Sequence, residues 1–189
     1  FHSTVAGYIK NSVVLSKNES YFAYLREFLI PAVGYDSDWL LCYRASSHGW
    51  AGDAFHTRCD GKKDMITIIQ KDQYVFGGYT DIPWDNDPYK GYRKTDKAFI
   101  FSLENKEGLA PFKSMVKQDS RAIYMKITYG PTFGGGFDIY IANNAGHNAR
   151  SYTNFGHSFL APREVKEKDT VLAGASHFTP DEVEVFYLS

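Results

Sequence analysis

Residues 39–84 read WLLCYRASSHGWAGDAFHTRCDGKKDMITIIQKDQYVFGGYTDIPW, and the rest of the chain is arranged around this segment. The order of apolar runs and glycines predicts a strand over 39–44, a loop over 45–49 and a short helix over 51–59. Gly61 lies just past that helix, where a left-handed residue ends many helices. Two more strands, 65–70 and 74–79, follow with a hairpin-like link between them. All three Trp, both Cys and two of the six His lie here, so we expect any functional site in this segment.

The rest of the chain predicts one helix and several strands. Residues 39–44 show no clean alternation, which favours burial on both faces or a central place in a sheet. Apolar residues recur at helical spacing over 18–30; Ser16 and Glu19 form a capping-box pattern before that helix, and Pro31 ends it. Further strands are predicted over 98–104, 122–129, 137–141 and 181–188, with shorter candidates at 155–160 and 171–175.

These elements predict a mostly β fold of the α+β class, a two-sheet antiparallel β-sandwich with a few short peripheral helices. The length of 189 residues fits a single domain, 1–189, with its core from about residue 10 and residues 1–9 as an N-terminal arm. The net charge of −1 gives no support to a nucleic-acid partner. No apolar run approaches the ~20 residues that a membrane span needs, so we expect none.

The most enzyme-like group comprises Ser46, Ser47, His48, His56 and Asp60. Acyl transfer needs a hydroxyl nucleophile, a His to take its proton and an acid to orient that His. No Gly-x-Ser-x-Gly motif is present. We therefore favour a structural interpretation, in which the serines cap the helix, His56 packs beneath it and the turn begins at Asp60, over a hydrolase.

The two cysteines, Cys42 and Cys59, are too few for a disulfide framework. We interpret them as buried thiols, with a single bridge between them as the alternative. A reactive Cys59 is disfavoured because it ends the predicted helix, where the helix dipole opposes a thiolate. Asn18-Glu19-Ser20 fits the N-glycosylation pattern and points weakly towards secretion.

Other motifs give little support to a cofactor or metal. The Gly77-Gly78 and 134–136 glycine runs lack the helix and Lys-Ser/Thr of a phosphate loop, so we expect no nucleotide cofactor. Asp85 and Asp87 offer oxygen ligands for calcium without the EF-hand spacing, and the histidines lack zinc-ligand spacing. The acidic residues at 181–184 are interpreted as a solvated strand face, or as a site for a basic partner.

Several linked motifs resemble the TLDc domain, which occurs in the oxidation-resistance proteins, nuclear receptor coactivator 7 and the TBC/TLDc proteins. The resemblance covers residues from about 10 to the end, and the variant looks like the TLDc proteins of invertebrate animals. The motifs are residues 41–46, Gly49-Trp50, Phe55-His56, residues 59–62, residues 74–80 with Pro83-Trp84, residues 130–141 and residues 182–186.

The resemblance implies a two-sheet sandwich and a non-enzymatic interaction domain that protects against oxidative stress. The implied partner is the peripheral part of the vacuolar proton pump, and the implied compartment is the cytoplasm. A Ser/His/acid grouping has been considered for this family, and Ser47, His56 and Asp60 lie in the matching region. The alternatives left open are a hydrolase or thiol enzyme and a secreted binding module with a disulfide and calcium. The family-pattern glycines are expected to hold the fold and its loop surface: Gly49, Gly61, Gly77, Gly78 and Gly135.

Overall fold

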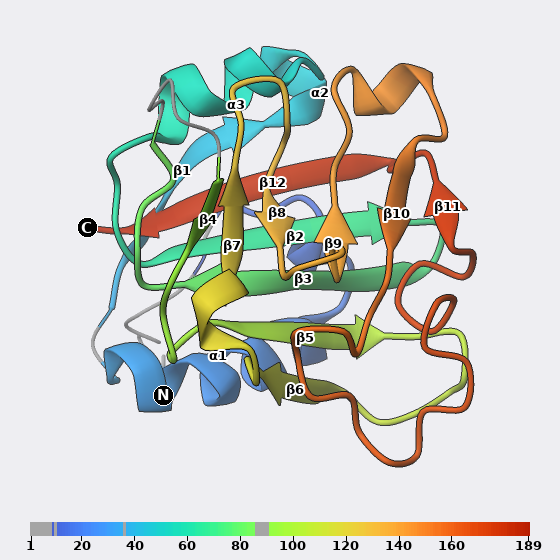
Figure 1. Ribbon diagram of the computed structural model, residues 1–189. Helices are drawn as coiled ribbons and strands as arrows, with labels where there is room; N and C mark the ends of the chain where they lie inside the picture. The colour runs from blue at the N-terminus through green and yellow to red at the C-terminus, as the bar shows by residue number, and fades with distance from the viewer. Residues whose placement is uncertain (1–8, 10, 36, 86–90) are drawn as a thin grey trace.

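A computed structural model describes residues 9, 11–35, 37–85 and 91–189 (Figure 1). Two six-stranded antiparallel sheets face each other, which confirms the predicted sandwich. Sheet A has the order β1-β12-β2-β3-β5-β6, and sheet B has the order β11-β10-β9-β8-β7-β4. The strands of sheet B cross in front of those of sheet A in Figure 1.

Sheet A consists of β1 (Trp39–Arg44), β12 (Glu182–Leu188), β2 (Met65–Lys71), β3 (Tyr74–Thr80), β5 (Phe99–Glu104) and β6 (Phe112–Met115). Sheet B consists of β11 (His177–Phe178), β10 (Ser151–Thr153), β9 (Ile139–Tyr140), β8 (Thr132–Phe133), β7 (Ile123–Met125) and β4 (Gly91–Arg93). The described helices are α1 (Glu19–Val33), α2 (Ala45–His48) and α3 (Gly52–Cys59), with short 3-10 turns η1 (Leu15–Lys17), η2 (Asp119–Arg121) and η3 (Ala145–His147).

Sheet A is buried on both faces. Between the sheets, Phe76 and Val185 belong to the same core cluster as Phe133 of sheet B. On its other face, Ile66 and residues of β5 pack against Leu25 of α1. A sheet covered on both sides needs continuous apolar strands, and this explains why β2 and β3 show long unbroken buried runs.

The strand β1 is correctly predicted, but its expected central position is wrong. It lies at the edge of sheet A and pairs with β12 alone. The register shifts between Leu41 and Tyr43, so the side chains change face there. Leu40 is 46% exposed while Cys42 and Tyr43 are both buried. The bulge, not burial on both faces, removes the alternation from this strand.

Helix α1 differs from its prediction at both ends. The side chain of Asn18, rather than a capping box from Ser16, accepts the N–H of Ser20 at 3.0 Å. Pro31 lies inside the helix and does not end it. The chain leaves the helix at Gly34, which has a φ of 81° and donates its N–H to Ile30 at 2.8 Å. Only Ala32 and Val33 follow Pro31 in the helix, so the backbone hydrogen bond that proline cannot make is one of the last of α1.

The strands of sheet B are shorter than predicted. Only 123–125 of the expected 122–129 strand and 139–140 of the expected 137–141 strand pair in the sheet. Residues 171–175 form a turn, Phe159 makes a single bridge to Val116, and residues 45–48 form a helical turn, not a loop. Just after the end of β7, the carbonyls of Lys126 and Tyr129 lie 2.9 Å from a ring nitrogen of His56.

Candidate functional site

The segment 44–60 wraps from the edge of sheet A over one end of the sandwich. The backbone N–H of Arg44 donates to Nδ1 of His48 at 2.9 Å, which closes the single turn of α2. Burial, followed by Arg58 and Arg44, lowers the pKa of His48. The N–H of Gly52, at the start of α3, donates to the side-chain oxygen of Asn143 at 2.9 Å. Both helices are therefore fixed to the ends of the two sheets.

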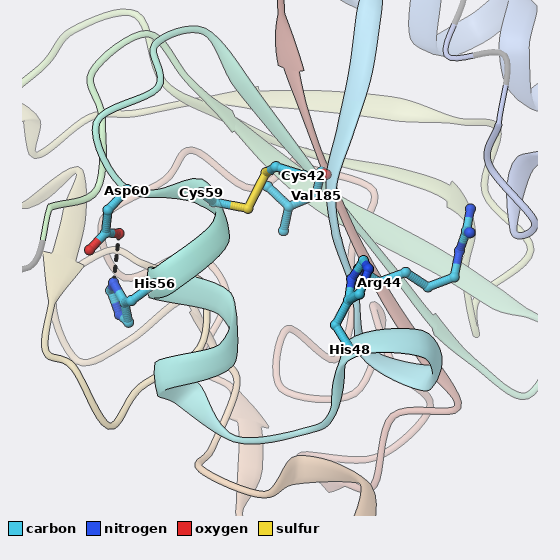
Figure 2. Close-up of a disulfide and its surroundings, with 7 residues drawn as sticks. All are labelled: Cys42, Arg44, His48, His56, Cys59, Asp60 and Val185. Atoms are coloured by element: carbon cyan, nitrogen blue, oxygen red, sulfur yellow. Dashed lines mark hydrogen bonds and ion pairs between the residues drawn. A yellow bond between two sulfur atoms is a disulfide. The ribbon is translucent and has the colours of Figure 1, made fainter.

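His56 lies on the buried side of α3 and is 2% exposed. Its Nδ1 lies 2.7 Å from a carboxylate oxygen of Asp60, and its Nε2 lies 2.9 Å from the carbonyls of Lys126 and Tyr129. Figure 2 shows His56 and Asp60 on the side of the helix away from the disulfide. Both ring nitrogens therefore lie within hydrogen-bond distance of oxygen atoms, those of Asp60 and of two backbone carbonyls. His56 connects α3 to sheet B.

The structure does not bring the predicted Ser47, His56 and Asp60 together as a catalytic triad. Both nitrogens of His56 already have oxygen partners other than a hydroxyl, and no serine bonds to the ring among the described residues. Ser47 is exposed on α2. The hydroxyl of Ser46 donates to Glu182 at 2.5 Å. His56 thus packs beneath the helix, and its ring makes no contact with Ser47 among the described residues, which a general base for that hydroxyl would need.

Cys42 and Cys59 form a disulfide with a Cα–Cα distance of 5.4 Å (Figure 2). Their residues are 8% and 0% exposed. The favoured interpretation as two free thiols is therefore wrong, and the alternative of a single bridge is present. A bonded and buried Cys59 offers no thiolate nucleophile, which removes the basis for a thiol enzyme. The bridge ties the end of α3 to β1.

The acidic residues of β12 are not a solvated face. Glu182 and Glu184 are 8% and 0% exposed. Glu184 accepts hydrogen bonds from Arg44, and Glu182 accepts them from the N–H and hydroxyl of Ser46. Both carboxylates fasten neighbouring segments to sheet A, so this strand offers no acidic surface for a basic partner.

The structure gives no metal centre in its described residues: no group of three or more His, Cys, Asp or Glu side chains could hold an ion there. Asp85 lies 3.6 Å from the guanidinium of Arg93. Asp87, the other calcium candidate, lies outside the described residues. No helix in the described part of the chain is long and apolar enough to cross a membrane.

A scan against protein-family models matches the TLDc domain over residues 10–189. The chain belongs to the TLDc domain family. No curated protein matches it in a sequence search. The match covers essentially the whole chain, so the segment of α2, α3 and the disulfide is part of the TLDc domain itself.

The family-pattern glycines of this TLDc domain lie at turns and close approaches. Gly49 and Gly61 follow α2 and α3 with φ values of 99° and 80°. Gly78 lies between the sheets, where a Cβ atom would come within 2.7 Å of the Phe133 ring. Gly77 packs against the backbone of Thr67, and Gly135 against the side chain of Arg121. These contacts support the expectation that the glycines serve the fold.

Sequence reasoning missed a second feature of this TLDc domain, on the outer face of sheet B. Tyr124 and Tyr140 alternate with core residues along their strands, and that alternation was the available signal. Tyr124 lies opposite Tyr92, and Tyr140 opposite Tyr152, in the strand register. The sequence separation between these strands conceals that their tyrosines form one surface.

Proposed function

We propose that this TLDc domain is a non-enzymatic protein-interaction module that protects against oxidative stress and binds the peripheral part of the vacuolar proton pump. Membership of the TLDc family supports the link to oxidative stress. The observation that carries the proposal is the position of the buried His56, whose two nitrogens lie against the carboxylate of Asp60 and two backbone carbonyls. Of the enzyme-like group, His56 connects α3 to the segment that follows β7 of sheet B, and Ser46 bonds to Glu182 of sheet A.

The experiment is a titration of the chain against the purified peripheral subcomplex of the pump. We expect saturable association with a change in the ATPase activity or assembly of the subcomplex. Ser47→Ala is the matched control, since an exposed hydroxyl with no structural partner in the described residues should leave binding unchanged. Absence of association with well-folded protein would refute the pump assignment, and substrate turnover that Ser47→Ala abolishes would refute the non-enzymatic role.

The disulfide supports a second candidate, a secreted binding module. Disulfides persist in oxidising compartments and are rare where glutathione keeps thiols reduced. Asn18 of the glycosylation pattern is exposed, as such an acceptor must be. Alkylation and intact mass of the protein from its native source separate the two candidates. A fully bonded pair carrying a glycan at Asn18 supports secretion, whereas two alkylatable thiols support the intracellular module.

A further inference from the structure

A continuous group of aromatic rings covers the outer face of sheet B. The strand register places Tyr92 opposite Tyr124, and Tyr140 opposite Tyr152. Ring centroids of adjacent members lie 4.8 to 6.4 Å apart. We call this group the tyrosine face, and it consists of Tyr92, Tyr124, Tyr129, Phe137, Tyr140 and Tyr152.

The tyrosine face points away from the core. Its strand neighbours Ile123, Met125 and Ile139 belong to the core between the sheets, so the alternating tyrosines lie on the opposite side. Tyr92 is 36% exposed, and the other members are half-buried by one another. None of the labelled helices crosses in front of β7, β8, β9 and β10 in Figure 1. The described residues leave this face open to a partner.

The flat faces of the rings are largely used in packing within the group. Most contacts within the group are edge-on or tilted, which uses ring faces for packing. Two further ring faces are covered by cations, because Lys126 lies 4.8 Å from the centroid of Tyr129 and Arg121 lies 5.4 Å from that of Tyr92. Within the described residues, Tyr152 alone of the five tyrosines has a protein acceptor for its hydroxyl, Gly136 at 3.5 Å.

The hydroxyls of Tyr124, Tyr140 and Tyr152 remain neutral donors. Burial, and then the neighbouring tyrosines, raise the pKa values of Tyr124, Tyr140 and Tyr152 above the ordinary value for a phenol. A surface of O–H donors with cations at its rim matches a partner that supplies carboxylates.

The charges around the face are mainly positive on the side of β4, β7 and β9. Arg121 and Lys126 lie over its rings, and Arg150 is close enough to act on the phenol of Tyr140. Arg93 is paired with Asp85. Beyond Tyr152, a hollow of about 320 Å³ contains one carboxylate, that of Asp169, in its lining. Tyrosine and arginine are enriched in the centres of protein interfaces.

We propose that the tyrosine face is the docking surface of this interaction module and that its partner is an acidic polypeptide segment. The inference rests on the proposed protein-binding function and adds the surface and the charge of the partner to it. Single-stranded nucleic acid stacks its bases on free ring faces, and the packing of this group leaves few ring faces free. The carboxylates of the partner accept from the tyrosine hydroxyls and pair with Arg121 and Lys126.

The test selects displayed random 15-residue peptides on the whole chain and sequences the bound pool. Arg121→Glu/Lys126→Glu removes the rim cations, and Tyr124→Phe/Tyr140→Phe/Tyr152→Phe removes hydroxyls while keeping the rings. The matched controls are Lys17→Glu/Lys106→Glu, which makes the same charge change elsewhere, and Tyr24→Phe on α1. Thermal unfolding of every variant confirms that it is folded.

We expect the selected peptides to be rich in Asp and Glu. The affinity of these peptides should fall about tenfold or more for the charge-reversal variant and by a measurable amount for the phenylalanine variant. Both control variants should bind the peptides with the affinity of the wild type. Peptides without acidic enrichment, peptides that bind the variants equally well, or no selected peptides would each overturn the proposal. Binding of a single-stranded oligothymidylate that needs these residues would also overturn it, by assigning the face to nucleic acid.

Titration of the same variants against the pump subcomplex separates the two proposals. If wild-type chain selects acidic peptides through the tyrosine face but does not bind the pump, only the pump assignment fails. If wild-type chain and the charge-reversal variant bind the pump equally well, the pump assignment stands and the docking surface is wrong.

Discussion

The guanidinium of Arg44 lies 2.8 Å from a carboxylate oxygen of Glu184, whose side chain has no exposed surface. The hydroxyl of Ser12 and the backbone N–H groups of Val13 and Val14 also donate to this carboxylate. One buried charge on β12 therefore holds both the end of β1 and the segment that precedes η1. Such a carboxylate is costly to leave without its partners.

Glu184→Gln should lower the free energy of unfolding by about 3–5 kcal/mol, because it leaves Arg44 without its charged partner in a buried site. Urea denaturation followed by circular dichroism measures the change. Glu164→Gln is the matched control at an exposed position, where a change within about 0.5 kcal/mol is expected. Equal denaturation midpoints for Glu184→Gln and the control would contradict the structural role of the pair.

The same strand marks the limit of sequence reasoning here. Alternation over 181–188 was enough to predict β12, but it also indicated that Glu182 and Glu184 face solvent. Alternation identifies two faces of a strand without saying what covers each. The partners that bury these carboxylates, Ser46 and Ser12, lie 136 and 172 residues away in the chain. Contacts at such separation have no local signal.

The sandwich could be predicted because β2, β3 and β5 carry long apolar runs that the core of sheet A requires. The bounds of the short strands of sheet B could not be predicted, since contacts with loops distant in the sequence determine where these strands end. At the candidate site, the residue types allowed both a triad and a structural tie for His56. Only the carbonyls of Lys126 and Tyr129, 70 and 73 residues away, decide between them.

His56→Gln should lower the free energy of unfolding by about 2–4 kcal/mol, because one amide cannot donate to Asp60 and to both carbonyls at once. Urea denaturation gives the total, and hydrogen exchange should show faster opening of α3 and of residues 126–129. Ser47→Ala is the control and should change neither measurement. A His56→Gln protein as stable as wild type would show that the buried ring is not a tie between these segments.

Removal of the disulfide should cost about 3 kcal/mol. Cys42 and Cys59 are 17 residues apart, and closing a loop of this size in the unfolded chain has an entropic effect of that order. Cys42→Ala/Cys59→Ala is the informative variant, since serine would bury two hydroxyls. Its denaturation curve should not change with reductant, whereas that of the wild type should shift to lower denaturant. The prediction would be contradicted if reductant left the denaturation midpoint of the wild type unchanged while alkylation showed that both thiols had been reduced.

Gly78→Ala should destabilise the domain by about 1–3 kcal/mol, because the new Cβ would come within 2.7 Å of the Phe133 ring between the sheets. Adding Phe133→Leu removes the ring and should recover part of this loss. The comparison of the double variant with Phe133→Leu alone isolates the clash. A loss that is unchanged by removal of the ring would mean that Gly78 is needed for another reason, such as contact with a ligand.

Asp138 should make the stability of the domain depend on pH. The residue is 0% exposed, and burial raises its pKa from 3.8 to about 7 against the opposing effect of N–H donors. Its carboxylate accepts from the backbone of Gly156, Ser158 and Phe159 at 2.9 to 3.2 Å. The carboxylate therefore holds the segment before the bridge to Val116 in place.

The sign follows from the raised pKa. Between about pH 4 and pH 7 the folded state keeps a proton on Asp138 that the unfolded state has lost, so this stabilisation is full below about pH 4 and lost as pH rises through 7. The shift of about three pH units corresponds to about 4 kcal/mol.

The variant Asp138→Asn stays neutral, so the unfolding free energy of wild type relative to this variant should fall by up to that amount between pH 4 and pH 7 and then level off. Asp96→Asn is the matched control, since it removes a carboxylate at an exposed position. The unfolding free energy of this variant should follow that of the wild type over the same pH range. A difference that stays constant over this range would mean that the N–H donors keep Asp138 ionised throughout, and that burial does not govern its charge.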